Sequence, residues 1–153
     1  VPRLFAAVAL LYGALDRRSS PLPPVLRSLV TVRISQLNWC RFCVDINSMT
    51  LARRAGSTDK VEALENWRAS TLYDERERVA LEYAEAMTNS GERVSDALME
   101  RLKRSFDDDA IIELTALIAF QNLSSKFNAA LDVPAQGFCR LPGGERPGDG
   151  SAT

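Results

Sequence analysis

The chain has 153 residues, of which 46% are hydrophobic, enough for one domain with a substantial core, since domains commonly contain ~100 to 150 residues. Nineteen Lys and Arg residues face 20 Asp and Glu residues, a net charge of −1, so no overall field favours nucleic acid or an anionic membrane as a partner. The chain has no histidine, the side chain that most often moves protons near neutral pH.

The first two elements are apolar, and only the first can be assigned to a helix from its pattern. Residues 4–15, LFAAVALLYGAL, fall short of the ~20 residues that cross a membrane, and no small-residue cleavage site follows them as in a secretion signal. We therefore expect a buried first helix. Residues 26–37 have an apolar spacing that fits a helix, but Val30, Val32 and Ile34 also alternate as in a strand. On pattern alone this second segment stays open between helix and strand.

The third element carries the sequence WCRFC. We expect its helix to begin near Trp39 or Cys40 and to end at Gly56, because glycine favours the left-handed conformation that follows many helices. Both Cys40 and Cys43 then lie in the first turn, where free backbone N–H groups and the helix dipole stabilise a thiolate. Arg41 adds a positive charge that acts in the same direction.

The chain from residue 59 to residue 131 is helical in period and composition. The expected helices run from Ser57 or Thr58 to about Trp67, over 74–87, after Ser95, and from the aspartates at 107–109 to about residue 131. This leaves no further strands for a thioredoxin fold. We take residues 1–139 as a single domain and residues 140–153, rich in Gly and Pro, as a flexible tail.

The spacing of Cys40 and Cys43 suits a redox pair, in which one thiolate attacks and the other thiol resolves the product. A zinc site is disfavoured because only Cys139 remains as a further ligand beyond the pair, and four are needed. Chance proximity of two small buried side chains is the plain alternative. We favour the redox pair, with no metal or cofactor. An odd cysteine count is unlike a secreted disulfide framework and fits a reducing cytoplasm.

Three stretches, PVLRSLVTVRISQLNWCRFCVDIN (24–47), ERVALEYAEAMT (77–88) and VSDALMERLKRSFDDDAIIELTALIAFQNLSSKFNAAL (94–131), with GFC at 137–139, resemble the carboxymuconolactone decarboxylase superfamily. The alkylhydroperoxidase D-like (AhpD-like) branch, which carries the CxxC, is the most similar, over a core of about residues 22–131. The resemblance implies an all-α fold, an AhpD-like helical bundle with the CxxC at the N-terminus of a central helix. It also implies homo-oligomers with peroxidase and disulfide reductase activity.

In that family the second cysteine attacks the peroxide and the first resolves it, which implies that Cys43 is peroxidatic and Cys40 resolving. The family also uses a glutamate and a histidine as a proton relay, and their positions are held here by Ser28 and Asn47. Neither is a general base near neutral pH. Asn47 is still expected to donate a hydrogen bond to a thiolate or peroxide oxygen. Ser28 lacks a histidine that would make it a nucleophile.

Four other residues are candidates for supporting roles. Glu113 is the only charge between residues 110 and 120, so it is either a helix-stabilising glutamate or a partly buried carboxylate with a raised pKa that serves the cysteines. Asp45 is expected to be a solvated first-turn residue. We expect Trp39 to pack in the core or an interface beside the cysteines, or to line a substrate pocket. Cys139 is expected to be a packed or free thiol.

Three classes of function remain. The first is a thiol-dependent alkylhydroperoxidase or disulfide reductase that acts on a small organic hydroperoxide or disulfide and is re-reduced by an unknown dithiol partner. The second is a non-catalytic or redox-sensing homo-oligomer with the same fold. The third is a lactone decarboxylase, which is disfavoured because such a site needs acid and base residues rather than thiols.

Overall fold

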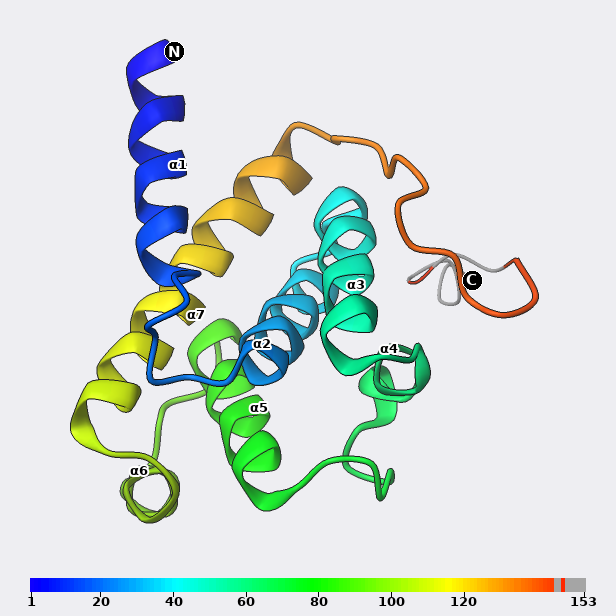
Figure 1. The fold of residues 1–153 in the computed structure, drawn as a ribbon. Helices are drawn as coiled ribbons and strands as arrows, with labels where there is room; N and C mark the ends of the chain where they lie inside the picture. The colour runs from blue at the N-terminus through cyan, green and yellow to red at the C-terminus, as the bar shows by residue number, and fades with distance from the viewer. Residues whose placement is uncertain (145–146, 148–153) are drawn as a thin grey trace.

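The computed structural model describes residues 1–144 and residue 147 (Figure 1). Within these residues the chain is helical and has no strand, which confirms the all-α class and makes the ambiguous second segment a helix. The α-helices are α1 (Pro2–Leu15), α2 (Pro24–Leu37), α3 (Arg41–Ala55), α4 (Asp59–Glu62), α5 (Glu75–Thr88), α6 (Asp96–Ser105) and α7 (Asp108–Ala130), with a 3-10 helix η1 (Leu64–Asn66). Most of the predicted tail, 140–153, lies outside the described residues.

Helix α2 is the centre of the bundle and contacts α3, α5 and α7. Its residues Leu26, Val30 and Ile34 pack into one apolar cluster with α5, α6 and α7. Leu29 and Val32 pack on another side, in a second cluster with α3, α4 and α5. A helix that is buried all round carries apolar residues on several sides and has no exposed polar face to mark its period. This is why the sequence pattern of α2 was compatible with both a helix and a strand.

Local capping sets one end of α3, α5, α6 and α7, close to the ends that the sequence predicts. Gly56 follows α3 with a φ of 78°, in the left-handed region. Asp74 begins α5 with a capping box that it shares with Glu77. The side chains of Ser95 and Asp107 accept backbone N–H groups at the starts of α6 and α7. These caps use residues close in sequence, so their signals are readable without the fold.

Helix α1 corrects the expectation of a buried first helix. The helix forms, but only Leu15 is buried, while the side chains of Phe5 and Leu10 are each 78% exposed. Figure 1 shows α1 extending beyond the rest of the bundle. Its neighbour is α7, which it meets through Tyr12 and Phe120, with ring centroids 6.0 Å apart. None of the described helices combines the length and apolar character that a membrane crossing requires.

The segment after α7 returns to α3 and is held there by a buried carboxylate. Asp45, 3% exposed, accepts the backbone N–H groups of Gln136 at 2.8 Å, Phe138 at 3.1 Å and Cys139 at 2.7 Å. The ring of Phe138 also packs edge-on against Phe42. The expectation that Asp45 is solvated is therefore wrong. Its side chain does face away from Cys43, as the helical phase predicted, but it faces protein and not water.

Burial alone raises the pKa of Asp45, but the backbone N–H donors at Cys139, Phe138 and Gln136 outweigh it and hold the pKa below its ordinary value. A carboxyl group with a lowered pKa in the folded state stabilises the fold most above its unfolded-state pKa of ~3.9. This stabilisation is lost as the pH falls through the lower folded-state value. The segment should therefore be anchored at neutral pH and loosened in acid.

Asp45→Asn removes the charge while keeping the size of the side chain. We expect a loss of about 2 kcal/mol in the free energy of unfolding at pH 7, since hydrogen bonds to a charged group are worth ~1.5 to 3 kcal/mol. The difference from wild type should shrink below pH ~4. Urea denaturation at both pH values measures it. Asp108→Asn, an exposed aspartate at the start of α7, is the control, and an equal loss there would contradict the anchoring role.

Candidate redox site

The turn between α2 and α3 places the two cysteines. Trp39 has a φ of 57°, in the left-handed region that bulky residues rarely adopt. The turn is held by backbone hydrogen bonds of 3.1 Å from Trp39 N to Gln36 O and from Cys40 N to Ser35 O. The indole ring is 77% exposed. The expectation that Trp39 packs in the core is therefore wrong. Its side chain lies on the surface, next to Cys40 in the sequence.

Cys40 and Cys43 form a disulfide at the N-terminus of α3, with their Cα atoms 5.2 Å apart. Cys40 is the N-cap, and its Sγ accepts the backbone N–H of Cys43 at 3.1 Å. Both are almost completely buried, at 1% and 2% exposed respectively. The placement in the first turn of α3 agrees with the sequence prediction. The pair thus lies in a position that is almost closed to water.

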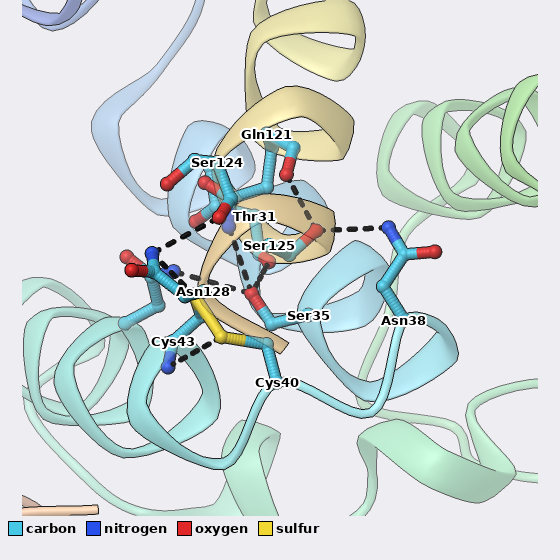
Figure 2. Close-up of a disulfide and its surroundings, with 10 residues drawn as sticks. Thr31, Ser35, Asn38, Cys40, Cys43, Gln121, Ser124, Ser125 and Asn128 are labelled. Atoms are coloured by element: carbon cyan, nitrogen blue, oxygen red, sulfur yellow. Dashed lines mark hydrogen bonds between the residues drawn. A yellow bond between two sulfur atoms is a disulfide. The ribbon is translucent and has the colours of Figure 1, made fainter. Parts of the chain in front are cut away.

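Amide and hydroxyl side chains surround the pair (Figure 2). The Oγ atom of Ser35 accepts hydrogen bonds from Gln121 at 2.9 Å and from Asn47 at 3.3 Å, and donates to the carbonyl of Thr31 at 2.6 Å. Asn38, at the end of α2, donates to Ser125 at 2.8 Å. These groups hold a hydrogen-bond network in place without titrating near neutral pH.

Asn128, next to this network, is the side chain that contacts a sulfur atom. Its side-chain nitrogen lies 3.5 Å from the Sγ of Cys43 and 3.0 Å from the carbonyl oxygen of Ser124. The sequence analysis missed Asn128. The signal was weak, because Gln121, Ser125 and Asn128 recur at helical spacing but other polar residues of α7, Asn122, Ser124 and Lys126, lie between them.

The two positions of the family relay line one small cavity of about 20 Å³, room for about one water molecule. The Oγ of Ser28 accepts a hydrogen bond from Arg54 at 3.0 Å, and Arg54 also binds both carboxylate oxygens of Asp16, at 2.9 and 2.8 Å. Asn47 lies beside them, but its amide donates to Ser35 and not to a sulfur atom. Ser28 and Asn47 thus line the same cavity, and neither contacts the cysteines through a hydrogen bond.

Arg41 and Glu113 have partners of their own. Arg41 is exposed and binds Asp132 at 2.9 Å, so its charge is partly compensated at the surface. Glu113 forms an ion pair with Arg17 and accepts a hydrogen bond from Ser20 at 2.8 Å. Burial raises the pKa of Glu113, but the hydrogen bonds from Arg17 and Ser20 and the positive charge of Arg17 outweigh this effect. The pKa of Glu113 is therefore lowered. The expectation of a raised pKa is wrong.

Glu113 is also far from the pair. At a rise of 1.5 Å per residue it lies about 22 Å along α7 from Asn128, the residue that meets Cys43. The structure therefore does not bring Glu113 to the cysteines. Cys139, the remaining thiol, is free and buried, as expected of a packed cysteine. Burial, and then the charge of Asp45, raise the pKa of its thiol.

The chain is similar in sequence to known proteins, and its arrangement of helices is similar to that of solved structures. The uncharacterized protein YnjA of Escherichia coli K12 is 54% identical over 142 residues, 93% of this chain and 78% of YnjA. A protein of unknown function from Agrobacterium tumefaciens, ATU0492, described as a putative antioxidant defence protein AhpD, superposes with a TM-score of 0.80. It is 28% identical, covering 88% of this chain and 92% of its own.

A second similar structure is that of the debrominase Bmp8 in complex with 2,3,4-tribromopyrrole. It superposes with a TM-score of 0.81 at 26% identity, over 90% of this chain and 73% of that chain. Residues 2–86 match the carboxymuconolactone decarboxylase family. Together with the all-helical fold and the CxxC at the start of α3, these likenesses identify the chain as a member of the carboxymuconolactone decarboxylase family, in its AhpD-like branch.

Proposed function

We propose that the chain is a thiol-dependent peroxidase that reduces small organic hydroperoxides, and through the same pair small disulfides. The observation that carries the proposal is the Cys40–Cys43 disulfide at the N-terminus of α3, where a thiolate is stabilised. The near-complete burial of both sulfur atoms favours a small substrate over a protein disulfide. No metal or cofactor is needed for this chemistry.

The proposed cycle has three steps. The thiolate of Cys43 attacks the terminal oxygen of the hydroperoxide, the O–O bond breaks, and the leaving alkoxide takes up one proton to become an alcohol. The thiol of Cys40 then attacks the resulting sulfenic acid, which forms the disulfide and releases water. A dithiol partner reduces the disulfide and is itself oxidised to a disulfide. Such a partner is expected in a reducing compartment, for which we propose the cytoplasm.

The neutral surroundings of the pair imply a slow enzyme. A general base typically contributes ~10² to 10⁴-fold in rate, and Ser28 and Asn47 supply none. Activation then depends on the helix N-terminus and on the hydrogen bonds to the sulfur atoms. The alkoxide must obtain its proton from water or from the thiol of Cys40.

The first test is consumption of cumene hydroperoxide by the fully reduced protein, with mass spectrometry of the cysteines. We expect consumption faster than that of a free thiol, with formation of the Cys40–Cys43 disulfide. Cys43→Ser should abolish it, because the attacking thiolate is gone, and Cys40→Ser should stop at an oxidised Cys43. Cys139→Ser is the control and should react like wild type. A wild-type rate equal to that of a free thiol would favour the non-catalytic, redox-sensing alternative.

Asn47→His tests whether the missing base limits the rate. The imidazole would lie one turn after Cys43 on α3, and we expect about a tenfold faster reaction with peroxide, at the lower end of general-base effects because its partner glutamate is still absent. The pH profile should gain an ionisation near ~6.5. Glu113→Gln is the control, because Glu113 lies far from the cysteines, and it should leave the rate unchanged. A slower Glu113→Gln enzyme would restore a role for Glu113.

Reductive debromination is a second candidate, favoured by the likeness to the debrominase Bmp8. Two thiols can remove bromine from a bromopyrrole. The ring carbon gains hydrogen, bromide and a proton are released, and the thiols are oxidised to the disulfide. Bromide release from 2,3,4-tribromopyrrole by the reduced protein, under conditions in which cumene hydroperoxide is untouched, would favour this function over the peroxidase. A lactone decarboxylase has no comparable support, because the groups around the pair are neutral amides and hydroxyls.

We also propose that the chain forms homo-oligomers through its exposed apolar helices. Phe5 and Leu10 project from α1, and Leu123, Phe127 and Leu131 recur every four residues along an exposed side at the end of α7. Monomeric proteins rarely expose apolar patches of this kind. A second copy of the chain, carrying the same apolar surfaces, would cover them.

Leu10→Asp places a charge in the middle of the exposed face of α1. We expect the wild type to be oligomeric in light scattering after gel filtration and the variant to shift towards the monomer, because burying an unpaired carboxylate in an interface is costly. Leu72→Asp, at an exposed leucine outside α1 and α7, should leave the assembly intact. A monomeric wild type at micromolar concentration would contradict the proposal.

A further inference from the structure

The orientation of the Asn128 amide is set by the helix that carries it. Its nitrogen donates to the carbonyl oxygen of Ser124, one turn earlier in α7. A carbonyl oxygen only accepts, so the nitrogen and not the oxygen of the amide must face it. The second hydrogen of the same nitrogen is then free to reach the Sγ of Cys43, 3.5 Å away. The amide is therefore held by its own helix and not by the disulfide.

The two sulfur atoms have different donors. Cys40 accepts from the backbone N–H of Cys43, a contact made within the first turn of α3. Cys43 accepts from Asn128, which comes from another helix. Among the described residues, Asn128 is the only side chain that donates a hydrogen bond to either sulfur. A donor to sulfur favours the thiolate over the thiol, because the charged form accepts the stronger hydrogen bond.

The charged groups near the pair do not take over this role. In the turns of α2, α3 and α7 beside the cysteines, and in the segment after α7, they are Arg33, Arg41, Asp45, Lys126, Asp132 and the exposed Arg140. Arg33 binds Glu85, Arg41 binds Asp132, and Asp45 accepts backbone N–H groups of the C-terminal segment. Lys126 is exposed. The pH dependence of Cys43 should then reflect its own ionisation.

We propose that Asn128 is a positioning residue that stabilises and aims the thiolate of Cys43 and does not act on Cys40. The inference rests on the proposed function in taking the pair to be reactive, and it adds a side chain that acts on one of the two cysteines. A fixed amide donor replaces the electrostatic part of a charged relay. It does not replace proton transfer, since an amide holds its hydrogens at neutral pH.

The test measures thiol ionisation rather than peroxide turnover. In a Cys40→Ser/Cys139→Ser background, Cys43 is the sole thiol, and its pKa follows from thiolate absorbance or from alkylation by iodoacetamide across pH. Asn128→Leu has a similar size and no donor, and we expect it to raise the pKa by about one unit, a tenfold smaller thiolate fraction at neutral pH. Asn128→Asp places a negative charge near the sulfur and should raise it further. Asn89→Leu, at the end of α5, is the matched control and should leave it unchanged.

A second background separates positioning from general damage to the fold. With Cys43→Ser/Cys139→Ser, Cys40 is the sole thiol, and Asn128→Leu should leave its pKa unchanged. Equal shifts of both thiols, or no shift of Cys43 in either Asn128 variant, would overturn the proposal. Asn128→Asp decides the question if the leucine variant does not fold. None of these measurements uses a hydroperoxide. If the protein proves not to be a peroxidase, the measured thiol pKa values still test the role of Asn128 separately.

Discussion

The rest of the structure depends on the burial of α2 on all its sides. Helices α3, α5 and α7 each pack on a different part of α2, so its position fixes theirs relative to one another. The end of α2 then leads, through the strained turn at Trp39, directly to the N-terminus of α3. An apolar core contributes roughly 25 cal/mol per Å² of buried apolar surface, ample to hold one left-handed residue, which costs ~1 to 2 kcal/mol. The redox pair is thus placed by the core and not by a flexible loop.

The chemistry around the pair differs from that of a charged active site. Ser35, Asn47, Gln121 and Asn128 hold their positions by hydrogen bonds among neutral groups. Such groups need no counterion and cost less to bury than an ionised pair. They also change little with pH, so the reactivity of the sulfur atoms should follow the thiols themselves. Without a histidine the groups around the pair transfer no protons, and their charge stays the same across the neutral range.

Features that depend on residues close together in the sequence could be predicted from the sequence, and contacts between distant residues could not. The start of α3 at Cys40, its end at Gly56 and the capping box at Asp74 depend on residues a few positions apart, so they were predictable. The contact of Asn128 with Cys43 spans 85 positions, and the partner of Glu113 lies 96 positions away. No local pattern contains such pairs. The exposure of α1 was not predicted for a related reason. The apolar character of a helix indicates that it packs against something, but it does not show whether the partner surface belongs to the same chain.

The anchoring of the C-terminal segment at Asp45 has a consequence for biosynthesis. The donors at Gln136 and Cys139 follow the carboxylate by 91 and 94 positions, so they leave the ribosome long after α3 has been made. Until then the nascent chain carries a carboxylate that cannot be buried at low cost, and the start of α3 lacks its cover. The contact can form only after the residues up to 139 have left the ribosome. A chain interrupted before residue 136 would leave Asp45 in water and the start of α3 uncovered, so this end of the helix should open more readily and be more open to proteolysis.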